Sequence, residues 1–265
     1  MPRLPPPEYV YSMATHLDLT DFLRDWDYHE GKNVRFLSTV DGRELMQVRL
    51  ALGVEQYELD GRPDGLRPHG YDSWLDYVID KVKDSKLDDN EYIIEPDEFT
   101  QLREEALLFY SRYLVLFQVG KYERVVKDTL HNLEITRIVE ECYHAEDKAD
   151  LLQYLPYIRR VNAVALSMLE LQSGNKAAAR AELEQGINDI EGYESYDSPV
   201  FAVEKLRSLS NLNQLLSQID APRPEGVTET DERDRLHGEL QKAIESENYE
   251  QAARIRDRLK DIDPK

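Results

Sequence analysis

The fold is decided by residues 96–142, PDEFTQLREEALLFYSRYLVLFQVGKYERVVKDTLHNLEITRIVEEC. Apolar residues recur here every three or four positions, which is the period of an α-helix with one buried face. Gly120-Lys121 interrupts the pattern, and Pro96 stands where a first-turn proline suits a helix. The stretch therefore predicts two long helices, antiparallel because their connection is short. Their apolar face comprises Phe99, Leu102, Ala106, Phe109, Tyr113, Leu116, Phe117, Val125, Val126, Leu130, Leu133, Ile138 and Cys142.

The same period continues to residue 220. A third helical stretch begins within Ala145 to Asp150 and is kinked or restarted at Pro156. Gly174-Asn175 ends it, and a fourth helix follows over residues 177–190. Ser198-Pro199 is typical of an N-cap followed by a first-turn proline and predicts a fifth helix reaching Ile219. Residues 91–220 therefore predict an antiparallel helical bundle or a short solenoid.

Two helix breaks within this region are alike. An apolar helical turn is followed by a glycine, a polar residue and the start of the next helix in both residues 116–125 and residues 169–179. Both resemble the centre of a tetratricopeptide repeat, in a degenerate form because Val125 and Lys176 depart from the pattern. The glycines are separated by 54 positions, so a regular array is excluded. The alternative is an ordinary bundle with two glycine C-caps.

The N-terminal region has a different pattern. Residues 1–7 form a proline-rich lead expected to be a disordered tail, and residues 8–85 predict a small α+β domain. Alternating residues on both sides of Asp41-Gly42 predict a β-hairpin, and Gly53 is expected to be a bulge before the strand pattern resumes. A helical period starts at Asp72.

A turn-rich loop in this region is the best candidate for a ligand site. Its side chains Asp60, Arg62, Asp64 and Arg67 include two carboxylates that suit a cation and two guanidinium groups that suit an anion. The preferred interpretation is a tight turn held by its aspartates and by arginine–carboxylate pairs.

Composition excludes several classes of function. The net charge of −20 and the pI near 4.7 repel phosphates, so no direct nucleic-acid binding is expected. Cys142 is the one cysteine, so no intramolecular disulfide is expected. No apolar run approaches the roughly 20 residues that a membrane-spanning helix needs. No secretory signal pattern is visible at Met1, which makes the cytoplasm the expected location. Phosphate loops, nucleophile elbows and histidine metal motifs are absent from the sequence, so we expect no enzyme, metal or cofactor.

The C-terminal region carries the most specific pattern. Residues 221–227, APRPEGV, are typical of a linker, and Thr228 or Thr230 is suited to cap the helix that follows in the 228–265 segment. Two helical stretches then flank a turn at Glu247-Asn248. The ordered elements of the pattern are Leu236, Leu240, Ala243, Ile244, Tyr249, Ala252, Ala253, Ile255, Arg256, Asp257, Leu259 and Ile262.

This order of residues resembles the UVR motif, a two-helix hairpin. In the proteins that carry it, the motif joins the excision-repair subunits UvrB and UvrC, and it also occurs in Clp-type chaperone ATPases and in adaptors of protein-arginine-kinase stress systems. The arrangement of hairpin strands with Asp-Gly-Arg, a helical middle and a terminal UVR motif resembles a group of bacterial proteins. The resemblance implies that these motif residues, apart from Ala243, form a protein-interaction surface, with Arg256 and Asp257 fixing the register.

The hairpin is too small to bury all its apolar residues by itself. Once its inner face is used, Ile255, Leu259 and the Tyr249 ring are expected to remain partly exposed. The hairpin must therefore dock on its own body, on a second copy or on a different protein, and the linker before it favours docking between chains. We expect a non-enzymatic adaptor; an accessory factor of nucleotide excision repair and an enzyme with a site in the N-terminal unit are the alternatives.

Overall fold

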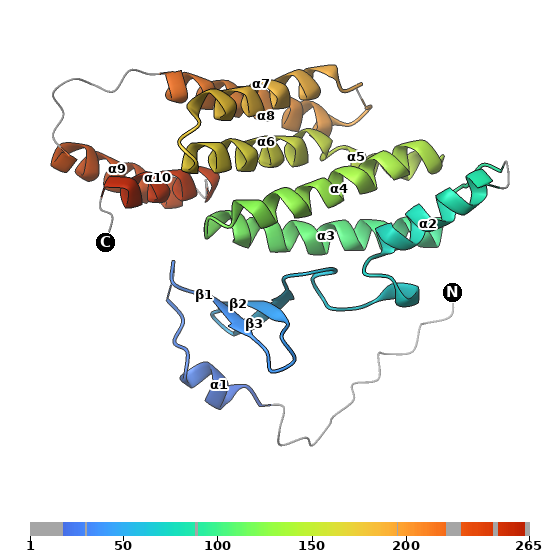
Figure 1. The fold of residues 1–265 in the computed structure, drawn as a ribbon, viewed down its shortest axis with the longest axis horizontal. Coiled ribbons are helices and arrows are strands. Elements are labelled where there is room, and N and C mark those ends of the chain that lie inside the picture. The colour runs from blue at the N-terminus through green and yellow to red at the C-terminus, as the bar shows by residue number, and fades with distance from the viewer. Residues whose placement is uncertain are drawn as a thin grey trace, which may run out of the picture. The chain divides into compact units, whose positions relative to one another are not determined.

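A computed structural model describes residues 18–29, 31–87, 90–194, 196–220, 229–245 and 249–262. The expected tail at residues 1–7, the linker at 221–227 and the candidate cap Thr228 lie outside this range. The chain divides into two compact units, residues 1–56 and residues 57–265 (Figure 1).

The first unit is built on a small antiparallel sheet. Helix α1 (Thr20–Arg24) precedes strands β1 (Val34–Ser38), β2 (Glu44–Leu50) and β3 (Gly53–Glu58), arranged in the order β1-β2-β3. Val34 lies opposite Val48, and Gly42 adopts a φ of 86° in the turn, which confirms the predicted hairpin at Asp41-Gly42. The expected bulge at Gly53 is wrong: a tight turn at residues 51–52 makes Gly53 the first residue of β3.

The second unit is almost entirely helical in its described part. After the short helix η1 (Pro68–Gly70), its elements are α2 (Trp74–Leu87), α3 (Pro96–Gln118), α4 (Tyr122–Cys142), η2 (Glu146–Lys148), α5 (Ala149–Leu152), α6 (Leu155–Gln172), α7 (Lys176–Gly192), α8 (Pro199–Asp220), α9 (Glu229–Glu245) and α10 (Tyr249–Ile262). Helix α3 packs on α4, α4 on α6, α6 on α7, and α8 on both α6 and α7 (Figure 1). The mainly helical fold class, with a small sheet and a C-terminal hairpin, is confirmed.

The predicted helix boundaries have the expected local causes. Gly120 and Gly174 adopt φ values of 73° and 76°, a left-handed conformation that ends α3 and α6 with little steric cost. Helix α3 starts with Pro96 inside a capping box formed by Glu95 and Glu98. The resemblance to tetratricopeptide repeats stays a prediction, although the α3–α4 and α6–α7 pairs are each joined at one of these glycines.

The boundary of the N-terminal domain differs from the expected one at residue 85. The apolar stripe of α2, formed by Leu75, Val78 and Val82, is buried in one cluster with side chains of α3 and α4 such as Phe99 and Ile138. Helix α2 therefore belongs to the helical unit. The sequence pattern of α2 shows that one face is buried, but it does not show against which element.

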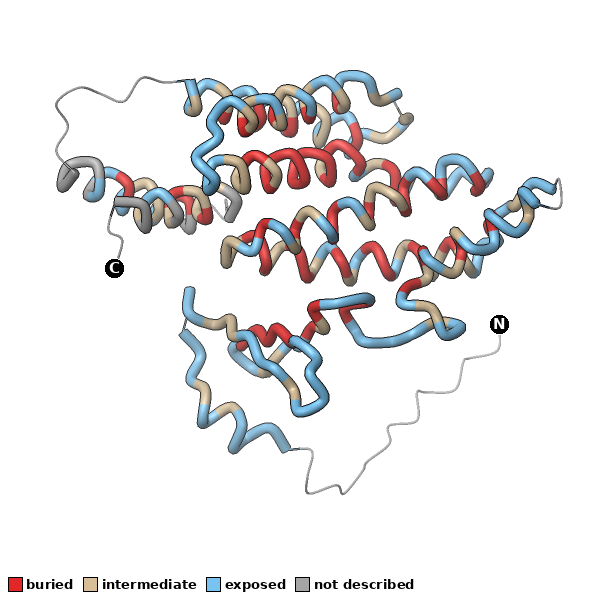
Figure 2. Tube along the Cα trace, in the orientation of Figure 1, coloured by how far each residue is buried: buried red, intermediate tan, exposed pale blue. Residues whose placement is uncertain are grey.

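Helix α6 forms the centre of the helical unit. Figure 2 shows its middle turns as buried, and the buried residues run without a break from Ile158 to Ala165. The contact with α7 is close, because a Cβ atom added to Gly186 would lie 2.5 Å from the Cβ atom of Ala163. Among the described residues, no helix combines the length and the apolar character needed to cross a membrane.

Candidate protein-interaction site

Helices α9 and α10 pack against each other as a hairpin with its own apolar cluster. The cluster residues recur at helical spacing on both helices, so each helix contributes one stripe to the contact. Leu236, Ala243 and Ile255 are buried, while Leu240, Ala252 and Leu259 are packed around them and stay partly exposed. The hairpin that the sequence predicts is therefore present, with the expected helices facing each other.

One expectation about this cluster is wrong. Ile255 was expected to remain partly exposed, but only 5% of it is accessible. Its position between Ala252 and Leu259 places it in the middle of the inward stripe, because residues three and four apart share a helix face. Leu259 is partly exposed, as expected. The side chains of Ile244, Tyr249, Asp257 and Ile262 lie outside the described part of the structure.

The hairpin contacts the body of its own chain through α10. This helix packs against α3, and Nη2 of Arg254 donates a hydrogen bond of 3.4 Å to Oδ1 of Asn211 on α8. Ala253 is buried although it is not part of the hairpin's apolar cluster. The structure thus shows the hairpin docked on its own body, one of the three arrangements that its small size allows.

The charge of α10 differs from that of the rest of the chain. Its sequence holds four basic and three acidic residues, in a protein whose net charge is −20. Arg256 is half-buried and Arg258 is exposed. A weakly basic helix on an acidic protein favours contact with an acidic surface, which can be supplied by the same chain or by another one.

The candidate ligand loop at residues 60–67 is tied to the helices by ion pairs. Arg62 is buried and pairs with Asp64 at 2.9 Å and with Glu105 of α3 at 3.1 Å. Asp60 pairs with Arg124 of α4 at 3.2 Å, and Arg67 pairs with Asp72.

Each of the four candidate side chains therefore has a partner of opposite charge within the fold. This arrangement agrees with the preferred interpretation of a tight turn pinned by arginine–carboxylate pairs.

A buried polar network extends from this loop. Glu105 also accepts hydrogen bonds from the backbone N–H groups of Trp74 and Leu75, at 2.7 and 3.0 Å. Arg112 donates to both carboxylate oxygens of Asp128, at 2.8 and 2.6 Å, and to the carbonyl oxygens of Glu58, at the end of β3, and of Gly61 in the loop. Burial raises the pKa of the Asp128 carboxyl group despite this pairing.

The network holds the loop, α2, α3 and α4 together. Within the described residues, no group of three or more His, Cys, Asp or Glu side chains is placed to hold a metal ion.

Comparison with known families agrees with the geometry of the hairpin. A family model described as the UvrB/uvrC motif matches residues 234–263, which cover most of α9 and all of α10. Residues 234–263 are thus a UVR motif, which is found in nucleotide excision repair proteins and mediates protein interactions. No curated protein and no solved structure matches the chain. The motif accounts for the hairpin alone.

Proposed function

We propose that this protein is a cytoplasmic, non-enzymatic adaptor that docks on partner proteins through the UVR hairpin. The observation that supports the proposal most directly is the coincidence of the UVR motif with a two-helix unit that has its own small apolar cluster. A hairpin of this size has to add apolar burial by docking on something else. In this structure the body supplies that burial through α3.

The proposed docking face contains the motif residues that remain accessible. Leu240, Ala252 and Leu259 are half-buried around the hairpin core and supply apolar area, and Arg256 lies half-buried beside them. Apolar residues bordered by an arginine are typical of the energetically important part of a protein interface. A partner either covers this accessible face or replaces the body as the surface that contacts α10.

Affinity capture from cytosol with tagged full-length chains tests the proposal. The variants are Leu259→Asp, which places a charge on the docking face, and Arg256→Glu, which reverses a charge without removing apolar area. The matched control is Leu206→Asp, at an exposed leucine of α8 outside the hairpin. We expect both hairpin variants to lose a partner that the control retains, with unchanged thermal unfolding of the body. Retention of every partner by both variants would show that the hairpin is not the interface.

A second candidate function is recruitment to nucleotide excision repair, and the motif match favours it because the UVR motif is found in repair proteins. The physical interaction is the same, and only the partner differs. The identity of the captured partner separates the two functions: a repair nuclease or helicase subunit supports the second, and a proteostasis factor supports a role as a general adaptor.

A further inference from the structure

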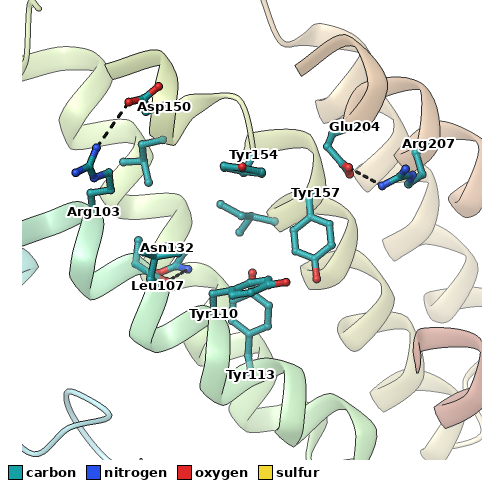
Figure 3. Close-up of a pocket in the computed structure, with 13 residues that line it drawn as sticks. Arg103, Leu107, Tyr110, Tyr113, Asn132, Asp150, Tyr154, Tyr157, Glu204 and Arg207 are labelled. Atoms are coloured by element: carbon teal, nitrogen blue, oxygen red, sulfur yellow. Dashed lines mark hydrogen bonds and ion pairs between the residues drawn. The ribbon is translucent and has the colours of Figure 1, made fainter. Parts of the chain in front are cut away.

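Helix α10 rests on a surface of its own body that is formed by α3 and α8. It packs against α3, and Arg254 donates a hydrogen bond to Asn211 of α8. Asn211 follows Arg207 by about one turn of α8, and Arg207 lines a cavity of about 540 Å³ between α3, α6 and α8 (Figure 3). The cavity therefore adjoins the place where α10 lies. Four tyrosines line it: Tyr110 and Tyr113 of α3, Tyr154 just before α6, and Tyr157 of α6.

Two features show that the body holds α10 weakly. The hydrogen bond from Nη2 of Arg254 to Oδ1 of Asn211 is 3.4 Å long, beyond the usual range of about 2.7–3.2 Å, and its acceptor carries no charge. The apolar surface beside it stays open, because Leu107 and Tyr154, which line the cavity, are 59% and 45% exposed. The docked helix thus buries only part of the apolar surface next to it, so its release should cost little free energy.

The two sides of α10 have different contacts. Ile255 and Leu259 belong to the apolar cluster shared with α9, so this side holds the hairpin together. Ala253 is only 3% exposed but lies outside that cluster, and the neighbouring Arg254 reaches α8, so this side faces the body. Ala253 is also one of the motif residues expected to form the interaction surface. The body therefore covers a part of the motif that a partner would use.

We propose that the body masks the UVR hairpin: α3 and α8 cover the Ala253 side of α10, and a partner binds this side only after α10 has left them. Such a partner competes with the body, so its apparent affinity is its intrinsic affinity reduced by the fraction of chains in which α10 is released. Residues 221–228 join α8 to α9 and can span up to about 28 Å, which lets the hairpin move away while α8 keeps its place. The inference rests on the proposed adaptor function and adds its regulation.

Substitutions of Asn211 test the masking without changing the sequence of the hairpin. Asn211→Lys places a cation against the guanidinium group of Arg254 and should release α10, whereas Asn211→Asp supplies a carboxylate partner and should hold α10 more tightly. The matched controls are Asn213→Lys and Asn213→Asp. Asn213 is an exposed residue of the same helix, and its Nδ2 donates to the carbonyl oxygen of Leu209 within that helix. The assay is amide hydrogen exchange of the purified full-length chain, followed by mass spectrometry.

We expect amide exchange in residues 249–262 to become about two- to fivefold faster in Asn211→Lys and slower by a similar factor in Asn211→Asp. Both Asn213 variants should exchange like the parent chain. Exchange in α6 should stay the same in all four variants, which shows that the body remains folded. Equal exchange of α10 in the two Asn211 variants would overturn the proposal, because the contact with α8 would then not hold the hairpin.

Partner binding separates the masking from the adaptor function. The probe is the protein that the parent chain enriches from cytosol over the Leu259→Asp chain, purified and titrated against each variant. Its affinity should be about two- to fivefold higher for Asn211→Lys and lower by a similar factor for Asn211→Asp. If both Asn211 variants bind this protein as tightly as the parent chain does, the adaptor function stands and the masking is wrong. If Leu259→Asp retains every partner, the adaptor function fails, and the exchange rates alone decide whether the body holds α10.

Discussion

Replacing Gly186 with alanine should destabilise the helical unit although alanine is the better helix former. In the middle of a helix the change from glycine to alanine normally stabilises by about 1 kcal/mol. Here the new methyl group would lie 2.5 Å from the Cβ atom of Ala163 and 3.4 Å from Cδ1 of Leu212. Carbon atoms in contact are normally about 3.5–4.0 Å apart, so α6 and α7 would have to separate by about 1 Å.

The size of the effect follows from these two opposed contributions. Overpacking of a close-packed core costs about 1–3 kcal/mol, and the gain in helix propensity offsets part of it. Because a separation of 2.5 Å is a severe overlap, the cost lies in the upper part of this range, about 2–3 kcal/mol. Less about 1 kcal/mol of helix propensity, Gly186→Ala should lower the free energy of unfolding by about 1–2 kcal/mol. The assay is urea denaturation followed by far-UV circular dichroism, with the transition midpoint compared at constant slope.

Two further variants test the reasoning. Gly192→Ala makes the same change at the end of the same helix, where an added Cβ meets nothing within 4 Å, and should be neutral or slightly stabilising. The double variant Ala163→Gly with Gly186→Ala moves the methyl group from one helix to the other and should recover part of the lost stability. If Gly186→Ala proves as stable as the parent chain, the close contact between α6 and α7 does not exist as described.

Three other predictions concern separate parts of the fold. Arg112→Met leaves the buried Asp128 without its partner and should destabilise the chain by about 3–5 kcal/mol, as measured by thermal unfolding. A loss of stability below about 1 kcal/mol would contradict a structural role for this ion pair. Gly238 lies in the interior of α9, where an added Cβ meets no atom within 4 Å. Gly238→Ala should therefore stabilise the hairpin by up to about 1 kcal/mol and slow amide hydrogen exchange in it. Faster exchange would be inconsistent with an open position at residue 238. Burial raises the pKa of the Cys142 thiol, so this thiol should not react with a disulfide reagent near neutral pH until guanidinium unfolds the chain. Rapid reaction of the native chain would refute the burial of Cys142. The stability that this pKa shift contributes is complete below the thiol pKa of the unfolded chain and is lost as the pH rises through the pKa of the folded chain.

The helices were predictable because their causes are local. Gly120 and Gly174 end helices through their own conformational freedom, and Pro96, Pro156 and Pro199 each stand in the first turn of a helix. Such signals act within a few residues and need no knowledge of tertiary contacts. The hairpin at Asp41-Gly42 was predictable for the same reason.

The features that the sequence analysis missed depend on contacts between distant residues. The pattern of α2 shows one apolar stripe, and only the structure shows that Leu75 and Val78 pack with α3 and α4. Asn132 of α4 and Glu204 of α8 line one cavity although they lie far apart in the chain, and neither residue carries a motif. The tyrosines that line it, Tyr110, Tyr113, Tyr154 and Tyr157, were the one available signal. Without the packing of the helices, such tyrosines cannot be told apart from core residues.

We propose that the UVR hairpin contacts another polypeptide, and site-specific photo-crosslinking detects such a contact in cells. A benzoylphenylalanine placed at the exposed residue His237 of α9 reports on whatever covers the hairpin in cells, and the same group at exposed Glu123 of α4 serves as the control. We expect a covalent adduct of higher mass from position 237, diminished by Arg256→Glu, and no adduct from position 123. Crosslinks that stay entirely within one chain would show that the hairpin serves only its own body and would contradict the adaptor function.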